Sequence, residues 1–288
     1  MAERGAVLRN QAEALAAPLP PLLVEAERVA ATVVQGTHGR RRTGPGENFW
    51  QFRRYQPGDA ATAIDWRQSA KSDPLYVRET EWAAAQSVWL WVDPSPSMRW
   101  RSRSDLPEKY GRGALLALAL ATLLTRGGER VGLLDQAMAP APGRAALLRL
   151  ALALEAAKPE AALPELGLPR HSHVVLFSDF LSPLESLDGM LRHLAGGGVH
   201  GHLLQLLDPA EETLPYQGRL RFAGLEGEGE LLVPGVESLR GAYAERLAGH
   251  RAGLAAIARA LGWSFATHRT DAPARTTLIS LHALLSGG

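Results

Sequence analysis

The chain has 288 residues, 46% of them hydrophobic and 21% charged, and its formal net charge is +1. This composition is typical of a globular protein with a full hydrophobic core, and the balanced charge argues against a nucleic-acid partner. Cysteine is absent, which excludes disulfides, thiolate metal sites and cysteine nucleophiles. Because we find neither a signal-peptide pattern nor an apolar run long enough to span a membrane, we expect a cytoplasmic protein.

The first part of the chain is predicted to form two segments. Residues 1–35 carry apolar side chains at helical spacing, with a break at three prolines, and are expected to be a helical region. Residues 36–83 begin with a glycine-rich basic loop and continue with closely spaced aromatic and charged side chains. This second segment is too polar for core helices, so we expect short strands and loops that pack against the main domain.

The rest of the chain, residues 84–288, predicts a doubly wound α/β domain with a mostly parallel sheet. Apolar runs of strand length alternate with helical patterns, as in βαβ units. The expected strands are 87–92, 130–134, 173–177, 199–207 and 264–268, and the expected helices are 109–126, 145–157, 182–194, 237–261 and 276–285. Residues 218–234 interrupt this alternation and predict a β-hairpin insertion.

Polar side chains follow two of the predicted strands. Asp93, Ser95 and Ser97 come directly after strand 87–92, and Asp179 follows strand 173–177. Because ligands bind at the carboxyl ends of strands in open α/β sheets, these oxygen donors are expected to share one site. Hard oxygen ligands suit Mg²⁺ or Mn²⁺. The alternative for Asp179 is that it caps the helix that begins near Ser182.

The pattern Asp93-x-Ser95-x-Ser97 resembles the first segment of the metal-ion-dependent adhesion site of von Willebrand factor A-type domains. The resemblance implies a Rossmann-type fold, and it makes Asp179 the acidic ligand that follows the fourth strand. The threonine ligand of that family has no counterpart here, and Arg144 stands near its expected place. An arginine there would repel a metal ion or replace it as a fixed charge beside Asp93 and Asp179.

Motifs upstream of the predicted strand 87–92 point to a more specific family. They read Arg53-x-Tyr55-x-Pro57-Gly58-Asp59, Ile64-Asp65-Trp66-Arg67-x-Ser69-Ala70 and Leu75-Tyr76-Val77-Arg78-Glu79. With the serine motif they resemble the signature of a bacterial family, number fifty-eight among the domains of unknown function, over about residues 35–285. Ala63 departs from it, since the family usually has arginine there. The resemblance implies an adaptor or co-chaperone of a MoxR-type AAA+ ATPase, acting on an unknown protein client.

The upstream signature residues allow two interpretations. The charged members can form a partly buried ion-pair network that holds the segment on the sheet, which we favour. They can instead form, with the aromatic side chains, a recognition surface for a protein partner. The residues concerned are Arg53, Tyr55, Asp59, Asp65, Trp66, Arg67 and Arg78.

We expect a protein–protein interaction module rather than an enzyme. The chain lacks a glycine-rich phosphate-binding motif and a nucleophile elbow, and no general base is evident beside the predicted metal ligands. Two alternatives stay open. One is a metal-independent scaffold that binds through the arginine- and aromatic-rich residues 47–82, and the less favoured one is a metal-dependent hydrolase.

Overall fold

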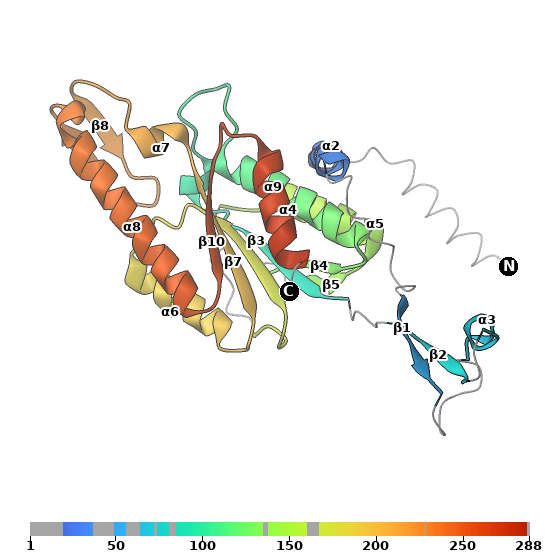
Figure 1. Cartoon of the computed structure of the whole chain (residues 1–288). Helices are drawn as coiled ribbons and strands as arrows, with labels where there is room; N and C mark the ends of the chain where they lie inside the picture. The colour runs from blue at the N-terminus through green and yellow to red at the C-terminus, as the bar shows by residue number, and fades with distance from the viewer. Residues whose placement is uncertain are drawn as a thin grey trace.

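The computed structural model describes residues 20–36, 49–55, 64–71, 74–80, 85–134, 138–159, 167–227 and 229–286. The side chains of residues 35–36, 49–53, 77–80 and 286 are not described. At the centre is a six-stranded sheet in the order β10-β7-β6-β3-β4-β5 (Figure 1). Its strands are β3 (Ser87–Val92), β4 (Arg130–Leu133), β5 (Met138–Ala141), β6 (His173–Ser178), β7 (His200–Leu207) and β10 (Ser264–Arg269).

The predicted doubly wound α/β fold is confirmed. All strands of this sheet run parallel except β5, which pairs antiparallel with β4. Apolar side chains on both faces of β3 and β6 are buried, as expected for strands covered by helices on either side. The two carboxyl ends that carry Asp93 and Asp179 therefore lie at one edge, on neighbouring strands.

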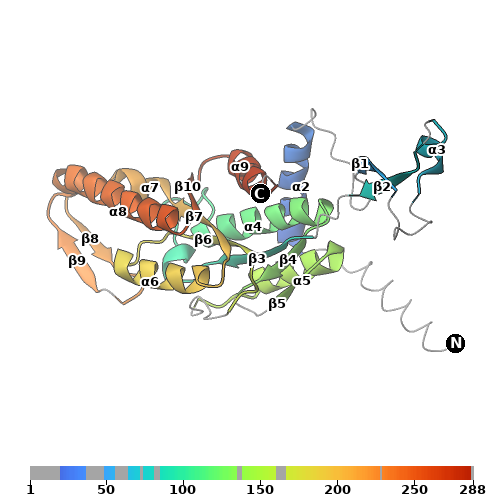
Figure 2. The same cartoon turned by 60° about the horizontal axis from the view of Figure 1, so that its bottom comes forward.

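Helices cover both faces of the sheet (Figures 1 and 2). On one face, a single core cluster joins side chains of α4 (Lys109–Arg126), α5 (Gly143–Glu155), α9 (Ala274–Ser286) and the N-terminal α2 (Pro21–Gly36). On the other face, α6 (Leu184–Ala195) and α8 (Arg240–Ala260) bury a second cluster that includes Trp89 and Trp91. Because α2 packs across α4, almost all of α4 is buried, which explains why its sequence is apolar all round.

Strand β5 is an element that the sequence did not predict. Its four residues include Pro140, which edge strands tolerate because one side of the backbone needs no hydrogen-bond partner. It lies very close to β4, since a Cβ atom on Gly132 would be only 2.4 Å from the carbonyl oxygen of Met138. Between β7 and α8 come α7 (Pro209–Thr213), the antiparallel pair β8 (Leu220–Ala223) and β9 (Glu230–Val233), and a 3-10 turn, η3 (Val236–Leu239).

The upstream signature residues form a small unit of their own. Strands β1 (Phe49–Arg54) and β2 (Tyr76–Thr80) pair antiparallel, and the short helix α3 (Trp66–Ser69) contacts β2. Figures 1 and 2 agree that this unit lies away from the central sheet, so its described residues do not pack over the sheet as the sequence predicts.

Among the described helices, none combines the length and the apolar composition that crossing a membrane requires.

Candidate functional site

The structure brings together the four predicted metal ligands at the carboxyl ends of β3 and β6. Val92 and Phe177 are partners in the parallel register, and the Asp93 backbone NH continues the ladder to the Phe177 carbonyl oxygen at 2.8 Å. The Ser97 hydroxyl donates to Asp179 Oδ2 at 2.8 Å, and the hydroxyl oxygens of Ser95 and Ser97 are 3.2 Å apart. These side chains therefore form one hydrogen-bonded oxygen cluster.

The Asp93 carboxylate is held by its own loop and by β6. Its Oδ1 atom accepts from the Ser95 backbone NH at 2.9 Å, and its Oδ2 atom accepts from the Ser178 hydroxyl at 2.5 Å. Burial raises the pKa of Asp93 above its ordinary value, although the hydrogen bond from Ser178 works in the opposite direction. The loop then enters a 3-10 turn, η2 (Pro96–Arg99), which follows Ser95.

Asp179 does not cap the following helix. Helix α6 begins at Leu184 after Pro183, whereas Asp179 Oδ1 accepts from the Leu181 backbone NH at 3.3 Å. The next residue, Phe180, has a left-handed φ of 47° and a buried ring. Its NH donates to the Ser178 hydroxyl and its carbonyl accepts from His250, so the unusual backbone is firmly held. The capping alternative is wrong, and the turn leaves Asp179 facing Ser97.

Lys109 is the main site residue that the sequence analysis missed. It is the first residue of α4 and is only 1% exposed. Its Nζ atom lies 2.8 Å from Asp179 Oδ2 and 2.5 Å from Glu211 Oε1. Burial works to lower the pKa of Lys109, but the two carboxylates together raise it above its ordinary value. The signal that the sequence offered was a lysine at the start of an otherwise largely apolar helix.

A third strand contributes to the same edge. Asp208 follows β7 and caps α7, because its carboxylate accepts from the Ala210 backbone NH at 2.8 Å and from the Ser102 backbone NH at 3.0 Å. Glu211 on α7 accepts from the Asp208 backbone NH at 2.8 Å and also binds Lys109. Burial raises the pKa of Glu211. The capping box thus fixes the second carboxylate that faces Lys109.

Arg144 does not lie beside Asp93 or Asp179. It is at the start of α5, its side chain is 62% exposed, and its nearest acidic partner is Glu27 on α2 at 3.8 Å. The reason is that residues 138–141 form the edge strand β5, which is separated from β6 by β3 and β4. The fixed cation that pairs with Asp179 is Lys109, and the prediction for Arg144 is corrected accordingly.

The oxygens of Ser95, Ser97 and Asp179 are hard donors of the kind that Mg²⁺ and Mn²⁺ take as ligands. Neighbouring ligands of an octahedral Mg²⁺ lie about 3 Å apart, because its bonds to oxygen are about 2.1 Å long. The observed oxygen separations of 3.2 Å and 2.8 Å at Ser97 bracket that spacing. Within the part of the chain that the structure describes, no three histidine, aspartate or glutamate side chains converge on a metal position. A metal ion here would therefore depend on the serine hydroxyls.

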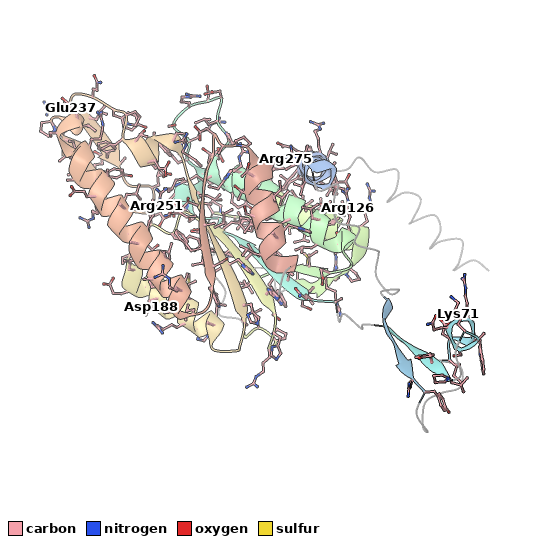
Figure 3. All side chains as sticks on the ribbon, viewed as in Figure 1. Lys71, Arg126, Asp188, Glu237, Arg251 and Arg275 are labelled. Carbon is pink, nitrogen blue, oxygen red and sulfur yellow. The ribbon has the colours of Figure 1, made fainter. Side chains whose placement is uncertain are left out.

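A network behind the site ties Asp179 to α8. Its backbone carbonyl accepts from Gln205 Nε2 at 2.8 Å, and Gln205 Oε1 accepts from Arg251 Nε at 3.0 Å. Arg251, labelled in Figure 3, also pairs with Glu212 of α7. The loop between β8 and β9 also contacts the site, because Glu226 Oε1 accepts from the Ser97 backbone NH at 3.4 Å.

The described signature residues lie in the small unit rather than at the site. Asp65 caps α3, since its carboxylate accepts from the Gln68 backbone NH at 2.9 Å, and the Tyr55 backbone NH donates to the Leu75 carbonyl at 2.8 Å. Trp66 is 64% exposed, and Arg67 is exposed beside it. Asp59 is outside the described residues, as are the side chains of Arg53 and Arg78 on β1 and β2.

Comparison with known proteins gives the family. Uncharacterized proteins of Mycobacterium tuberculosis and Mycobacterium bovis are 29% identical to this chain over 277 residues, covering 89% of this chain and 85% of each relative. Solved structures that match include the BatB protein of Bacteroides thetaiotaomicron (14% identity, TM-score 0.39, 71% of this chain and 100% of that one). Another is an aerotolerance-related membrane protein of Bacteroides fragilis (12% identity, TM-score 0.43, the same coverage). Residues 51–253 match the model described as a protein of unknown function, DUF58, so the chain belongs to the DUF58 family.

Proposed function

We propose that this protein is a non-enzymatic docking module that recognises a protein partner through a divalent cation, Mg²⁺ or Mn²⁺, at the Asp93–Asp179 site. The observation that carries the proposal is the oxygen cluster of Ser95, Ser97 and Asp179, whose spacing matches neighbouring ligands of such an ion. The bound ion would supply a positive charge with one open position for a carboxylate of the partner.

The protein's own residues prepare this site in three ways. Ser95 and Ser97 present hydroxyl oxygens from a short turn that two prolines stiffen. Ser178 orients the Asp93 carboxylate, and the bond between Ser97 and Asp179 joins the two loops. Such preorganisation lowers the entropy that is lost when a partner binds, and a charged contact favours partners of the right sign.

The partner that the family resemblance implies is a MoxR-type AAA+ ATPase, with a protein client acted on by the pair in the cytoplasm. A purified ATPase of this type, captured on a biosensor, tests the proposal directly in Mg²⁺, in Mn²⁺ and in EDTA. We expect binding that is lost in EDTA and weakened by about tenfold or more in Asp93→Ala, which corresponds to about 1.4 kcal/mol.

The control is Asp188→Ala, which removes a carboxylate on α6 that pairs with Arg192 at 2.8 Å (Figure 3). This variant should bind as the unchanged protein does. Binding that is equal in EDTA and Mg²⁺ and insensitive to Asp93→Ala would overturn the proposal.

A second candidate is metal-independent binding through the small β1–β2 unit. It is favoured by the 64% exposure of Trp66, since exposed tryptophan and arginine side chains are typical of binding hot spots. In that case binding survives EDTA and is lost in Trp66→Ala. Leu152→Ala, which trims another exposed apolar side chain on α5, serves as the control.

A further inference from the structure

We infer that Lys109 is a built-in cation that competes with the divalent ion for Asp179 and so sets the metal affinity of the site. The inference rests on the proposed function and adds a residue that controls it. Its basis is one juxtaposition: the ammonium group of Lys109 and the hydroxyl of Ser97 both bind the same carboxylate oxygen, Oδ2 of Asp179, each at 2.8 Å.

The position of Lys109 is unfavourable for a positive charge in two respects. A buried ammonium group is strongly desolvated, and a positive charge in the first turn of a helix opposes the helix dipole. Lys109 has both disadvantages, because it begins α4 and is 1% exposed. Its carboxylate partners, Asp179 and Glu211, offset these costs. The position of the Lys109 side chain is therefore fixed by its ion pairs with these two carboxylates.

The charges at the site leave room for a second cation. The carboxylates of Asp93, Asp179 and Glu211 lie at the site or in contact with it, and that of Glu226 accepts from the Ser97 backbone NH, whereas Lys109 supplies one positive charge. An arriving divalent ion and Lys109 both require Asp179 Oδ2. Since Lys109 also binds Glu211, its ammonium group retains one partner when the ion takes Asp179. The lysine thus lowers metal affinity without excluding the metal.

Titration of Mn²⁺ into the purified protein, followed by calorimetry, tests this inference. We expect Lys109→Met to bind Mn²⁺ about tenfold or more tightly than the unchanged protein, because a competing charge is removed. The exposed Lys158→Met is the matched control and should bind as the unchanged protein does. In the double variant Asp93→Ala, Lys109→Met the tight binding should disappear.

A second variant guards against misfolding of Lys109→Met. Glu211→Gln removes the negative charge of the other partner of Lys109. Lys109 should then hold Asp179 more firmly, so Mn²⁺ should bind more weakly than to the unchanged protein. Thermal unfolding adds an independent readout: Lys109→Met should melt at a lower temperature in EDTA and regain stability in Mn²⁺.

The outcomes separate this inference from the proposed function. If Lys109→Met is folded and binds Mn²⁺ no more tightly, or if Glu211→Gln binds as tightly as before, the inference is overturned, even where Asp93→Ala still abolishes binding. If only Lys109→Met binds Mn²⁺, the inference holds and the metal-dependent function of the unchanged chain fails. If no variant binds, both are overturned.

Discussion

The hydroxyl of Ser97 donates to Asp179 Oδ2 at 2.8 Å, although the two residues are 82 positions apart in the chain. The bond exists because β3 and β6 are neighbours in the sheet, and residues that follow two parallel neighbours emerge at the same edge. It joins the two loops of the candidate site directly, so the site depends on correct pairing of these strands.

Ser97→Ala should remove both the link and a proposed metal ligand. We expect a small loss of stability, about 1 kcal/mol as for a typical hydrogen bond, and a loss of Mn²⁺ affinity of about tenfold or more. Urea unfolding and calorimetry measure the two effects. Ser186→Ala on α6 serves as the control, and an unchanged Mn²⁺ affinity in Ser97→Ala would show that the serine does not bind the ion.

Glu226→Gln should strengthen docking of an acidic partner. Glu226 reaches the Ser97 backbone NH from the β8–β9 loop, so its carboxylate competes with that of a partner at the proposed site. We expect the partner to dissociate more slowly and the affinity to rise by a few-fold, about 0.5–1 kcal/mol. Glu230→Gln changes the same charge on β9, where it pairs with Arg221, and should have no effect. Weaker binding by Glu226→Gln would contradict the prediction.

Gly201→Ala should destabilise the fold. A Cβ atom on this residue of β7 would be 1.9 Å from the Trp263 ring, which is buried and donates to the Val199 carbonyl at 3.0 Å. Overpacking of this kind costs about 2–3 kcal/mol. Gly189→Ala on α6 is the matched control: nothing lies within 4 Å of its Cβ position, so we expect a gain of about 0.5–1 kcal/mol. Denaturant unfolding measures both, and equal stabilities would refute the packing explanation.

The protein should lose stability when the pH falls below about 6.5. Burial, followed by the charge of His173, lowers the pKa of His202 to about 4, and burial, followed by the charge of Arg112, does the same for His268. The folded state therefore favours neutral imidazole, whereas the unfolded chain takes up a proton near pH 6.5. The stability is full above pH 6.5 and is lost towards pH 4, by on the order of 2 kcal/mol for each histidine at pH 5.

Urea unfolding at pH 7.5 and pH 5 measures this loss. His202→Gln should reduce the difference between the two pH values, because His202 is buried and stacks on His173 with ring centroids 5.8 Å apart. His193→Gln, an exposed position on α6, should leave the difference unchanged. A difference that is the same in all three proteins would mean that His202 is not responsible.

The five parallel strands of the sheet and the loops that carry Asp93 and Asp179 could be predicted from the sequence. Strands buried on both faces must be continuously apolar, so the runs at β3, β6 and β7 are visible without any tertiary information. The short edge strand β5 escaped prediction because four residues with two alanines and a proline carry no such pattern. Because β5 was not predicted, the position expected for Arg144 was wrong as well.

Which charges face the site depends on the tertiary structure. Lys109 belongs to a helix that follows β3, and Glu211 belongs to the short helix that follows β7. The contacts of Lys109 with Asp179 and Glu211 therefore require three separate strands to end at one edge. A long side chain has many rotamers and several partners within reach, and local sequence does not select among them. Burial makes the selection, because a charge removed from water is stable only where opposite charges already lie.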